Sequence, residues 1–237
     1  MISFLEYLNE AEDIESNMQF KETVAFCSGS YKPPHEGHLY MVEQYAKMAD
    51  RVIILISSPK SAKSVRKTSV GTIITPEMSK KIWEIYLKAY HLKNVTVEVS
   101  TEASPITAMF KYVDDNLSDV NVIFGVSKKG GDEARFKSAT KYYEDNAHIN
   151  LLDPIETAVE PFASKDGKAI SATDIRDNVD KPDVIKKLLP SKLGKSDLAK
   201  VIDILSNGPK ESIEEDESSD DAEDSRDNLD EFECIHL

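Results

Sequence analysis

Two histidines, His35 and His38, stand three residues apart after a run of apolar residues that is typical of a buried strand. A loop with Pro33 and Pro34 leads into a helix start, where the two rings would share one face. Gly37 between them leaves space for a ligand, and the backbone N–H groups of a helix N-terminus attract anions. Two imidazoles over such a site suit a phosphate that gains charge during a reaction. Metal ligands or surface histidines are the alternatives.

A second candidate site lies some 135 residues further along, in the segment Ile-Ser-Ala-Thr-Asp-Ile-Arg at 170–176. Ser171 and Thr173 are hydroxyls at an expected helix N-terminus, able to cap it or to bind phosphate oxygens. Arg176 is one turn further on the same face and supplies a fork-shaped cation. A plain capping motif with a surface arginine is the alternative for this segment taken alone.

Two basic stretches complete the list of candidates. Gly125 ends an apolar run and is followed by Lys128, Lys129 and Arg135. Another apolar run, 51–56, is followed by Lys60, Lys63, Arg66 and Lys67. The stretch 61–74 is longer than a usual connection, so it is a candidate for a mobile lid. Solvated basic loops are the alternative for both stretches.

The elements that would position these residues alternate between strand and helix. The expected strands are 24–27, 51–56, 95–99, 120–125 and 149–152. The expected helices are 37–49, 76–90, 104–117 and 132–145, followed by a strand-like 157–162 and helices at 172–178, 182–189 and 196–205. Such alternation predicts an α/β fold with a doubly wound, mainly parallel sheet. Ligands of these sheets bind beyond the carboxyl ends of the strands, near the topological switch point.

The ends of the chain differ from its middle. The net charge is −14, yet residues 21–209 alone are close to neutral. We expect an amphipathic N-terminal arm at 1–21, one domain at 22–206 and a disordered acidic tail at 207–237. No apolar run is long enough for a membrane span, and two cysteines suit a reducing cytosol. Residues 1–10 also resemble the cleaved N-terminal tags of capsid-packaged proteins of large tailed phages, although an ordinary arm is favoured.

The two motifs together resemble the nucleotidyltransferase superfamily marked by His-x-Gly-His. The stretch 29–38, Gly-Ser-Tyr-Lys-Pro-Pro-His-Glu-Gly-His, resembles its first signature, and 170–176 looks like its Ile-Ser-x-Thr-x-x-Arg signature. The resemblance covers about 22–180. It implies a Rossmann-like sheet and attack of a substrate phosphate on the α-phosphorus of a nucleoside triphosphate, with release of pyrophosphate. It also implies a Mg²⁺ ion carried by the triphosphate, with no protein residue as a metal ligand.

Carried over residue by residue, the resemblance makes His35, His38 and Arg176 the catalytic candidates. The residues that it implies for nucleotide binding are Gly29, Ser30, Tyr31, Gly37, Gly125, Lys128, Lys129, Ser171 and Thr173.

The form of the motifs looks more like the pyridine-mononucleotide adenylyltransferases than like other branches. It therefore favours ATP and an acceptor such as nicotinamide mononucleotide, with neither nucleic acid nor a membrane as a partner. One alternative is a cytidylyltransferase acting on a small phospho-alcohol. A second is a non-enzymatic, nucleotide-binding protein associated with a virion.

Overall fold

The computed structural model describes residues 20–58, 60–128, 136–162 and 170–210. The strands are β1 (Glu22–Gly29), β2 (Arg51–Ile56), β3 (Val95–Val99), β4 (Val120–Phe124) and β5 (Ile149–Leu151). The helices before β5 are α2 (Glu36–Met48), the 3₁₀ turn η1 (Ala62–Ser64), α3 (Pro76–Ala89), α4 (Pro105–Asn116) and α5 (Lys137–Tyr143). Those after it are α6 (Pro154–Thr157), α7 (Ala172–Arg176), α8 (Pro182–Leu188) and α9 (Lys195–Asn207).

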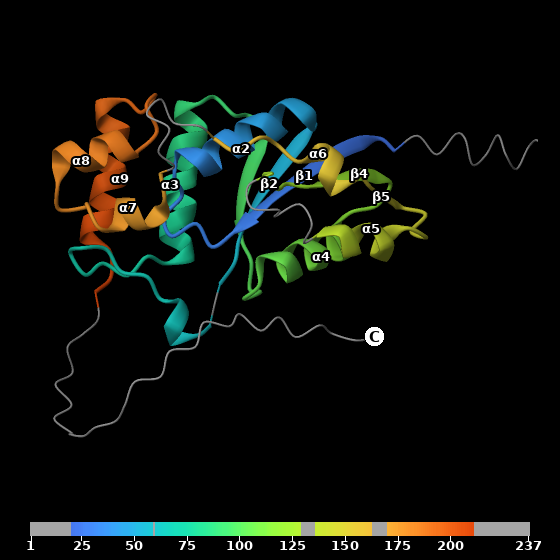
Figure 1. The fold of residues 1–237 in the computed structure, drawn as a ribbon, viewed down its shortest axis with the longest axis horizontal. Helices are drawn as coiled ribbons and strands as arrows, with labels where there is room; N and C mark the ends of the chain where they lie inside the picture. Colours follow the sequence, from blue (N-terminus) through green and yellow to red (C-terminus); the bar gives the residue numbers. More distant parts are fainter. Residues whose placement is uncertain (1–19, 59, 129–135, 163–169, 211–237) are drawn as a thin grey trace, which may run out of the picture.

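The five strands form one sheet in the order β3-β2-β1-β4-β5, and every pairing is parallel. The helices that follow β1 and β2 cover one face, and those that follow β3 and β4 cover the other (Figure 1). The predicted doubly wound α/β fold is thereby confirmed. The direction of winding reverses between β1 and β4, so the carboxyl ends of these two strands flank the switch-point crevice.

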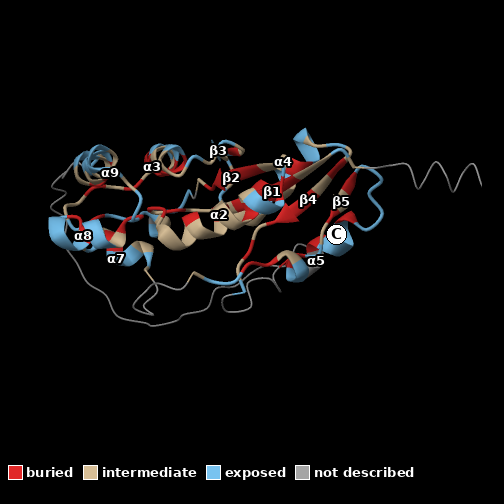
Figure 2. Cartoon of the chain, turned by 90° about the horizontal axis from the view of Figure 1, so that it is seen from above, coloured by how far each residue is buried: buried red, intermediate tan, exposed pale blue. Residues whose placement is uncertain are grey.

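Each face of the sheet has its own hydrophobic core, and the strands between them are almost entirely buried (Figure 2). On one face α2, α3 and the C-terminal helices pack around Trp83, Tyr86 and Tyr45, which are fully buried. On the other face α4 and α5 pack against Phe26 and Phe124. Burial on both faces explains why β2 and the middle of β1 are continuous apolar runs in the sequence.

The start of α3 was predicted correctly from the sequence, because its capping residues are adjacent along the chain. Thr75 caps α3 by accepting a hydrogen bond from the Met78 N–H at 3.2 Å, with Pro76 in the first turn. The predicted helix 132–145 ends earlier, at Tyr143, and its first four residues lie outside the described residues.

The expected strand at 157–162 was wrong. Asp153 caps a short helix, α6, that ends at Thr157, and only Val159 then pairs, through one isolated parallel bridge to Ser127. Pro161 has no N–H to continue a ladder. The segment therefore runs as an extended edge beside the end of β4.

The long connection 60–74 ends in a docked hairpin. Lys67 pairs with Ile73 around a turn in which Gly71 has φ +82°. The Ser69 N–H donates to the Arg176 carbonyl at 2.8 Å, and the Ile73 N–H donates to the Pro209 carbonyl at 2.8 Å. These bonds attach the second half of the expected lid to α7 and to the end of α9.

The chain is still closely packed just after the end of α9. Gly208 packs so closely on Met78 and Thr72 that an added Cβ would lie 2.6 Å and 2.7 Å from their side chains. Most of the expected arm (1–19) and tail (211–237) lies outside the described residues. Within the described part of the chain, no helix has the length and apolar character needed to span a membrane.

Candidate active site

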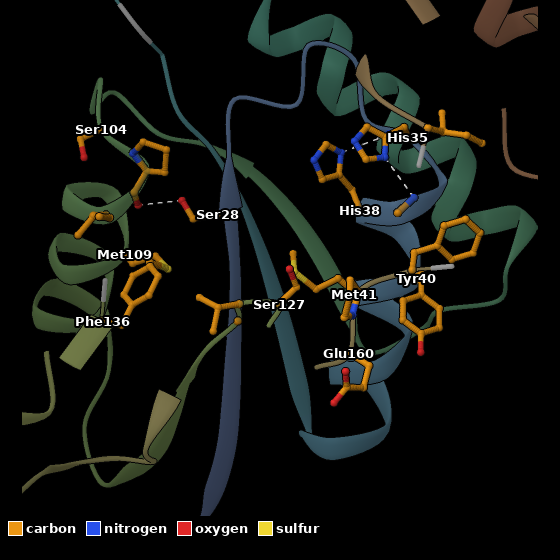
Figure 3. A pocket seen from close by; sticks show the side chains of 18 residues that line it. Ser28, His35, His38, Tyr40, Met41, Ser104, Met109, Ser127, Phe136 and Glu160 are labelled. Carbon is orange, nitrogen blue, oxygen red and sulfur yellow. Dashed lines mark hydrogen bonds between the residues drawn. The ribbon is translucent and has the colours of Figure 1, made fainter. Parts of the chain in front are cut away.

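A cavity of about 820 Å³ opens at the switch-point crevice. Its wall consists of the end of β1, the first turns of α2 and α4, the segment that follows β4, residues 160–162, and Ile170 (Figure 3). Ile170 is the first residue of the second sequence motif and lines this wall, whereas Ser171, Thr173 and Arg176 do not. Aromatic and sulfur-containing side chains make much of the wall, including Tyr40, Met109, Phe136 and Phe162.

His35 and His38 both face this cavity from the first turn of α2, as expected from their spacing (Figure 3). His35 is the N-cap, and its Nδ1 accepts a hydrogen bond from the Gly37 N–H at 3.1 Å. The Nδ1 of His38 accepts from the His35 N–H at 3.3 Å, which completes a capping box. The rings stack with centroids 3.6 Å apart.

These bonds assign the tautomer of both rings. A neutral imidazole whose Nδ1 accepts a hydrogen bond carries its proton on Nε2. The proton of each neutral ring is therefore on Nε2, and both rings lie beside a helix N-terminus, where negative charge is favoured. The pair can stabilise a phosphate that rearranges its charge.

Tyr31 supports the histidines from the core and does not line the cavity. It is 5% exposed, and its ring meets His38 edge-on with centroids 4.9 Å apart. An added Cβ on Gly29 would lie 3.0 Å from that ring, and one on Gly37 would lie 3.1 Å from His35. The glycines of the first motif thus let aromatic rings close over the backbone.

Two other predicted nucleotide-binding residues take part in packing around the cavity. Ser30 shares a hydrogen bond of 3.2 Å with the buried Ser57 and does not line the cavity. Gly125 does line it, and its N–H donates to the Phe26 carbonyl at 2.7 Å. A Cβ at position 125 would lie 2.5 Å from that carbonyl oxygen, so β4 can approach β1 this closely only with glycine there.

The second motif caps α7 and connects to the first. Ser171 and Asp174 form a capping box, with the Ser171 hydroxyl accepting from the Asp174 N–H at 3.1 Å. Thr173 accepts from Arg176 Nη2 at 2.8 Å. The other end of the Arg176 guanidinium donates to the Lys32 carbonyl at 2.6 Å, which joins the two motifs across 144 residues.

Lys32 is a candidate phosphate-binding residue that was not predicted from the sequence. Of the basic residues in 60–67, Arg66 lies close enough to Lys32 to affect its pKa. Burial and the charges of Arg66 and Arg176 lower the pKa of Lys32, and burial and Arg66 lower the pKa of Arg176. Lys32 Nζ donates to the Ser64 carbonyl at 2.8 Å. Arg66 donates to the carbonyls of Lys63 and Val65. We call Lys32, Arg66 and Arg176 the cation cluster.

The cation cluster lacks a balancing carboxylate among its hydrogen-bond partners. Within the described residues, its three members form no ion pair and donate to carbonyl or hydroxyl oxygens. Three mutually repelling cations held by neutral groups are suited to an anion with several charges. The sequence around Lys32 did not predict this cluster, because Arg66 and Arg176 come from distant segments of the chain.

The basic residues after β4 are arranged differently. Lys128 Nζ lies 2.6 Å from a carboxylate oxygen of Glu160, which lines the cavity. The charge of Lys128 is therefore already compensated. Lys129 and Arg135 lie outside the described residues.

The family model described as cytidylyltransferase-like matches residues 26–178, which is more than half of the chain and includes both motifs. The chain belongs to the cytidylyltransferase-like family. This is a nucleotidyltransferase superfamily, as the resemblance of the two motifs indicated.

Solved structures that resemble this family member include two of a bifunctional NMN adenylyltransferase/ADP-ribose pyrophosphatase from Francisella tularensis, one of them complexed with AMP and an Mn ion. Each is 17% identical to this chain, with TM-scores of 0.48 and 0.49, and 78% of this chain is covered. The matches cover 52% and 53% of those proteins, so this chain spans about half of their length. No curated protein matches the chain.

Proposed function

We propose that this protein is an adenylyltransferase that transfers AMP from ATP to a mononucleotide such as nicotinamide mononucleotide and releases pyrophosphate. The observation that carries the proposal is the arrangement of His35 and His38. Both rings line the cavity at the end of β1, and each accepts a backbone N–H at Nδ1, which fixes its orientation there. Membership of the cytidylyltransferase-like family supports a nucleotidyl transfer at this site.

The proposed reaction is a single displacement. A phosphate oxygen of the acceptor attacks the α-phosphorus of ATP, and the bond from that phosphorus to the bridging β-oxygen breaks. Pyrophosphate leaves with the electron pair of the broken bond. We infer that the Nε2–H groups of His38 and His35 donate to the α-phosphate oxygens as charge rearranges there.

The cation cluster supports a role in holding the leaving group. Lys32, Arg66 and Arg176 come from three separate segments and would meet the β- and γ-phosphates as their charge grows. Such contacts strengthen in the transition state, so they lower the barrier and do not merely tighten binding. The predicted roles of Ser171 and Thr173 become indirect in this proposal, since their hydroxyls cap α7 and hold Arg176.

A divalent ion enters the proposal with the triphosphate. Within the described residues, no three histidine, cysteine or carboxylate side chains gather as a metal site, and Glu160 at the cavity is paired with Lys128. This donor set fits an ion held by phosphate oxygens and water. Mg²⁺ supplies charge neutralisation on the triphosphate when it is bound.

The cavity supports an acceptor with a ring over a small phospho-alcohol. Its volume of about 820 Å³ is in the range of sites for whole small-molecule ligands. Tyr40 and Phe162 form an aromatic pair at its wall, with ring centroids 5.6 Å apart. Aromatic walls of this kind stack on flat heterocycles.

The proposal is tested by measuring pyrophosphate release with Mg²⁺, each of the four nucleoside triphosphates and a panel of acceptors. The panel contains nicotinamide mononucleotide, glycerol phosphate, choline phosphate and phosphopantetheine. We expect the highest turnover with ATP and nicotinamide mononucleotide, and a dinucleotide as product. Higher turnover with CTP and a phospho-alcohol would assign the cytidylyl branch. Nucleotide binding without turnover would identify a non-enzymatic binding protein.

A further inference from the structure

One wall of the cavity, the segment that follows β4, does not belong to the hydrogen-bonded sheet. β4 pairs with β1 as far as Phe124, and the chain then leaves the sheet at Gly125. The next residues bond to the extended segment 157–160 through the isolated bridge between Ser127 and Val159. This two-segment wall carries the cavity residues Gly125, Ser127 and Glu160.

The hydroxyl of Tyr45 lies between the two segments of this wall. It donates to the Val126 carbonyl at 2.8 Å and lies 3.1 Å from the Thr157 carbonyl, so its hydrogen is shared between two acceptors. It also accepts from the Val126 N–H at 3.0 Å. Tyr45 is fully buried, so water does not replace these bonds. One oxygen atom therefore satisfies three backbone groups where β4 leaves the sheet.

Tyr45 belongs to the same helix as the two histidines. It is on the buried face of α2, two turns after His38, and its ring touches the floor of the crevice at Gly125. α2 thus presents the histidines at its N-terminus and reaches the opposite wall through Tyr45. The distance between the histidines and that wall is set by this one rigid element.

We propose that Tyr45 is a positioning residue that fixes the width of the switch-point crevice, so that a nucleotide in the cavity contacts the histidines and the 125–128 wall together. This inference rests on the proposed nucleotidyl transfer for its kinetic consequences, but its structural part stands without it. Tyr45 acts through Val126 and Thr157 and touches no reacting atom.

The experiment compares Tyr45→Phe, which removes only the oxygen, with Tyr143→Phe as a matched control. Tyr143 is also buried, but its hydroxyl donates to Asp114 on α4 at 2.9 Å, and it does not line the cavity. Amide hydrogen exchange is measured at Val126, Lys128 and Val159. We expect Tyr45→Phe to speed exchange at all three by about tenfold or more, with amides of β2 unchanged. Tyr143→Phe should leave the three amides unchanged.

Kinetics separate positioning from mere packing. With Tyr45→Phe, KM for ATP or for nicotinamide mononucleotide should rise on the order of tenfold while kcat changes by less than about threefold. Loss of fold alone would lower kcat and leave KM unchanged. In the wild-type protein, Mg-ATP or nicotinamide mononucleotide should slow exchange at the same three amides. This last measurement needs no variant, and unchanged exchange on ligand binding would overturn the contact between nucleotide and wall even if Tyr45→Phe unfolds.

The outcomes distinguish the inference from the proposed function. Unchanged exchange at Lys128 and Val159 in Tyr45→Phe, or a kcat loss with unchanged KM values, would overturn the positioning role. Absence of any binding or turnover in the wild-type protein would instead overturn the proposed function, and exchange at the three amides would still decide whether Tyr45 holds the wall.

Discussion

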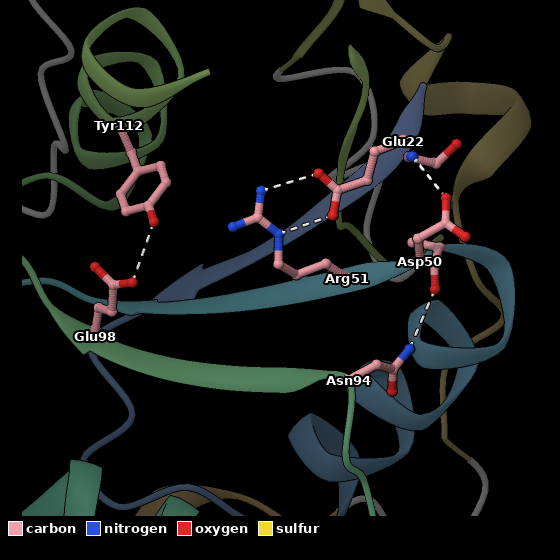
Figure 4. Close-up of polar contacts among 8 residues, drawn as sticks. Glu22, Asp50, Arg51, Asn94, Glu98 and Tyr112 are labelled. Carbon is pink, nitrogen blue, oxygen red and sulfur yellow. Dashed lines mark hydrogen bonds and ion pairs between the residues drawn. The ribbon is translucent and has the colours of Figure 1, made fainter. Parts of the chain in front are cut away.

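Charged side chains have different partners at the two ends of the parallel strands, which we call the two edges below. At the edge where the strands begin, Arg51 forms two hydrogen bonds with Glu22, and Asp50 accepts from the Thr23 N–H at 2.8 Å (Figure 4). His148 at the same edge lies 2.8 Å from an Asp119 carboxylate oxygen.

At the edge where the strands end, the cation cluster bonds to carbonyl and hydroxyl oxygens, and the two histidines bond to backbone N–H groups. Charges at the first edge are compensated within the protein, which suits a structural role. At the second edge Lys128 is also paired, with Glu160, whereas the cation cluster has no carboxylate among its described hydrogen-bond partners and keeps more of its electrostatic potential for a ligand. We call the edge where the strands begin the structural edge. It and the proposed site both contain histidines and basic residues, but the partners of these side chains differ.

The largest expected effect compares the histidines of the two edges. His38→Asn places an amide oxygen near the position of Nδ1, which preserves the capping bond, but removes the Nε2–H. Loss of one preorganised donor to the reacting phosphate should lower kcat by on the order of 10²- to 10³-fold, about 3 to 4 kcal/mol. The matched change at the other edge, His148→Asn, should leave kcat within about twofold in the pyrophosphate-release assay. Equal kcat values for the two variants would remove the distinction between the edges.

The next effect concerns backbone packing at the crevice. Gly125→Ala places a Cβ 2.5 Å from the Phe26 carbonyl and 3.0 Å from the Tyr45 ring, so β4 must move. We expect a loss of about 2 to 3 kcal/mol in the free energy of unfolding. Gly194→Ala is the control, since nothing lies within 4 Å of its added Cβ, and it should cost less than about 1 kcal/mol. Urea denaturation of both variants measures the difference, and similar losses would contradict the close approach.

A third prediction uses the repulsion within the cation cluster. The folded-state pKa of Lys32 is below its ordinary value of 10.5, so the charged lysine destabilises the fold. That cost is complete below the lowered pKa and is relieved as pH rises through it toward 10.5. Lys32→Gln should therefore not lower Tm without ligand, and any gain in Tm should shrink as pH rises through this window.

The same variant also tests what the cluster binds. Inorganic pyrophosphate should raise Tm of the wild-type protein, and this increase should be largely lost in Lys32→Gln. Arg51→Gln, which removes a cation at the structural edge, should retain the full pyrophosphate effect. Thermal unfolding with and without pyrophosphate measures both, and an equal pyrophosphate effect in Lys32→Gln and wild type would show that the cluster binds no phosphate.

The smallest effect is expected at the structural edge itself. Glu22→Gln breaks the ion pair between Glu22 and Arg51. Both side chains of this pair are 36% exposed. Pairs with this exposure are worth less than about 1 kcal/mol, so unfolding in urea should change little and turnover not at all. A loss of several kcal/mol would mean that this edge is a stability determinant as well as a compensated surface.

Local signals explain where prediction from the sequence succeeded. The predicted strands 51–56 and 95–99 match β2 and β3 residue for residue. β2 is an almost continuous apolar run because it is buried on both faces, whereas β3 lies at the edge of the sheet and alternates valine with the exposed Thr96 and Glu98. Thr75 with Pro76 marks a helix start by chemistry contained within four residues. The histidine pair was located for the same reason, since its spacing and the loop before it are local features.

Prediction failed where the outcome depended on distant partners. The segment 157–162 has strand-like composition, but Asp153 and Pro154 begin a helical turn before it and only Ser127 pairs with it. The predicted role of Tyr31 in nucleotide binding stays a prediction, and its packing against Gly29 and Trp83 in the core could not be predicted from neighbouring residues.

The sequence by itself determined the alternation of strands and helices from β1 to β5, the caps of α3 and α7 and the two motifs, because each depends on residues that are neighbours along the chain. Only the tertiary structure decided which cations stay uncompensated. Lys128 and Lys32 both follow a strand near the crevice, yet Lys128 meets Glu160, 32 residues away, and Lys32 meets Ser64 and Arg176. The potential of a charged side chain depends on what lies within a few ångströms of it, and folding brings those groups from remote parts of the chain.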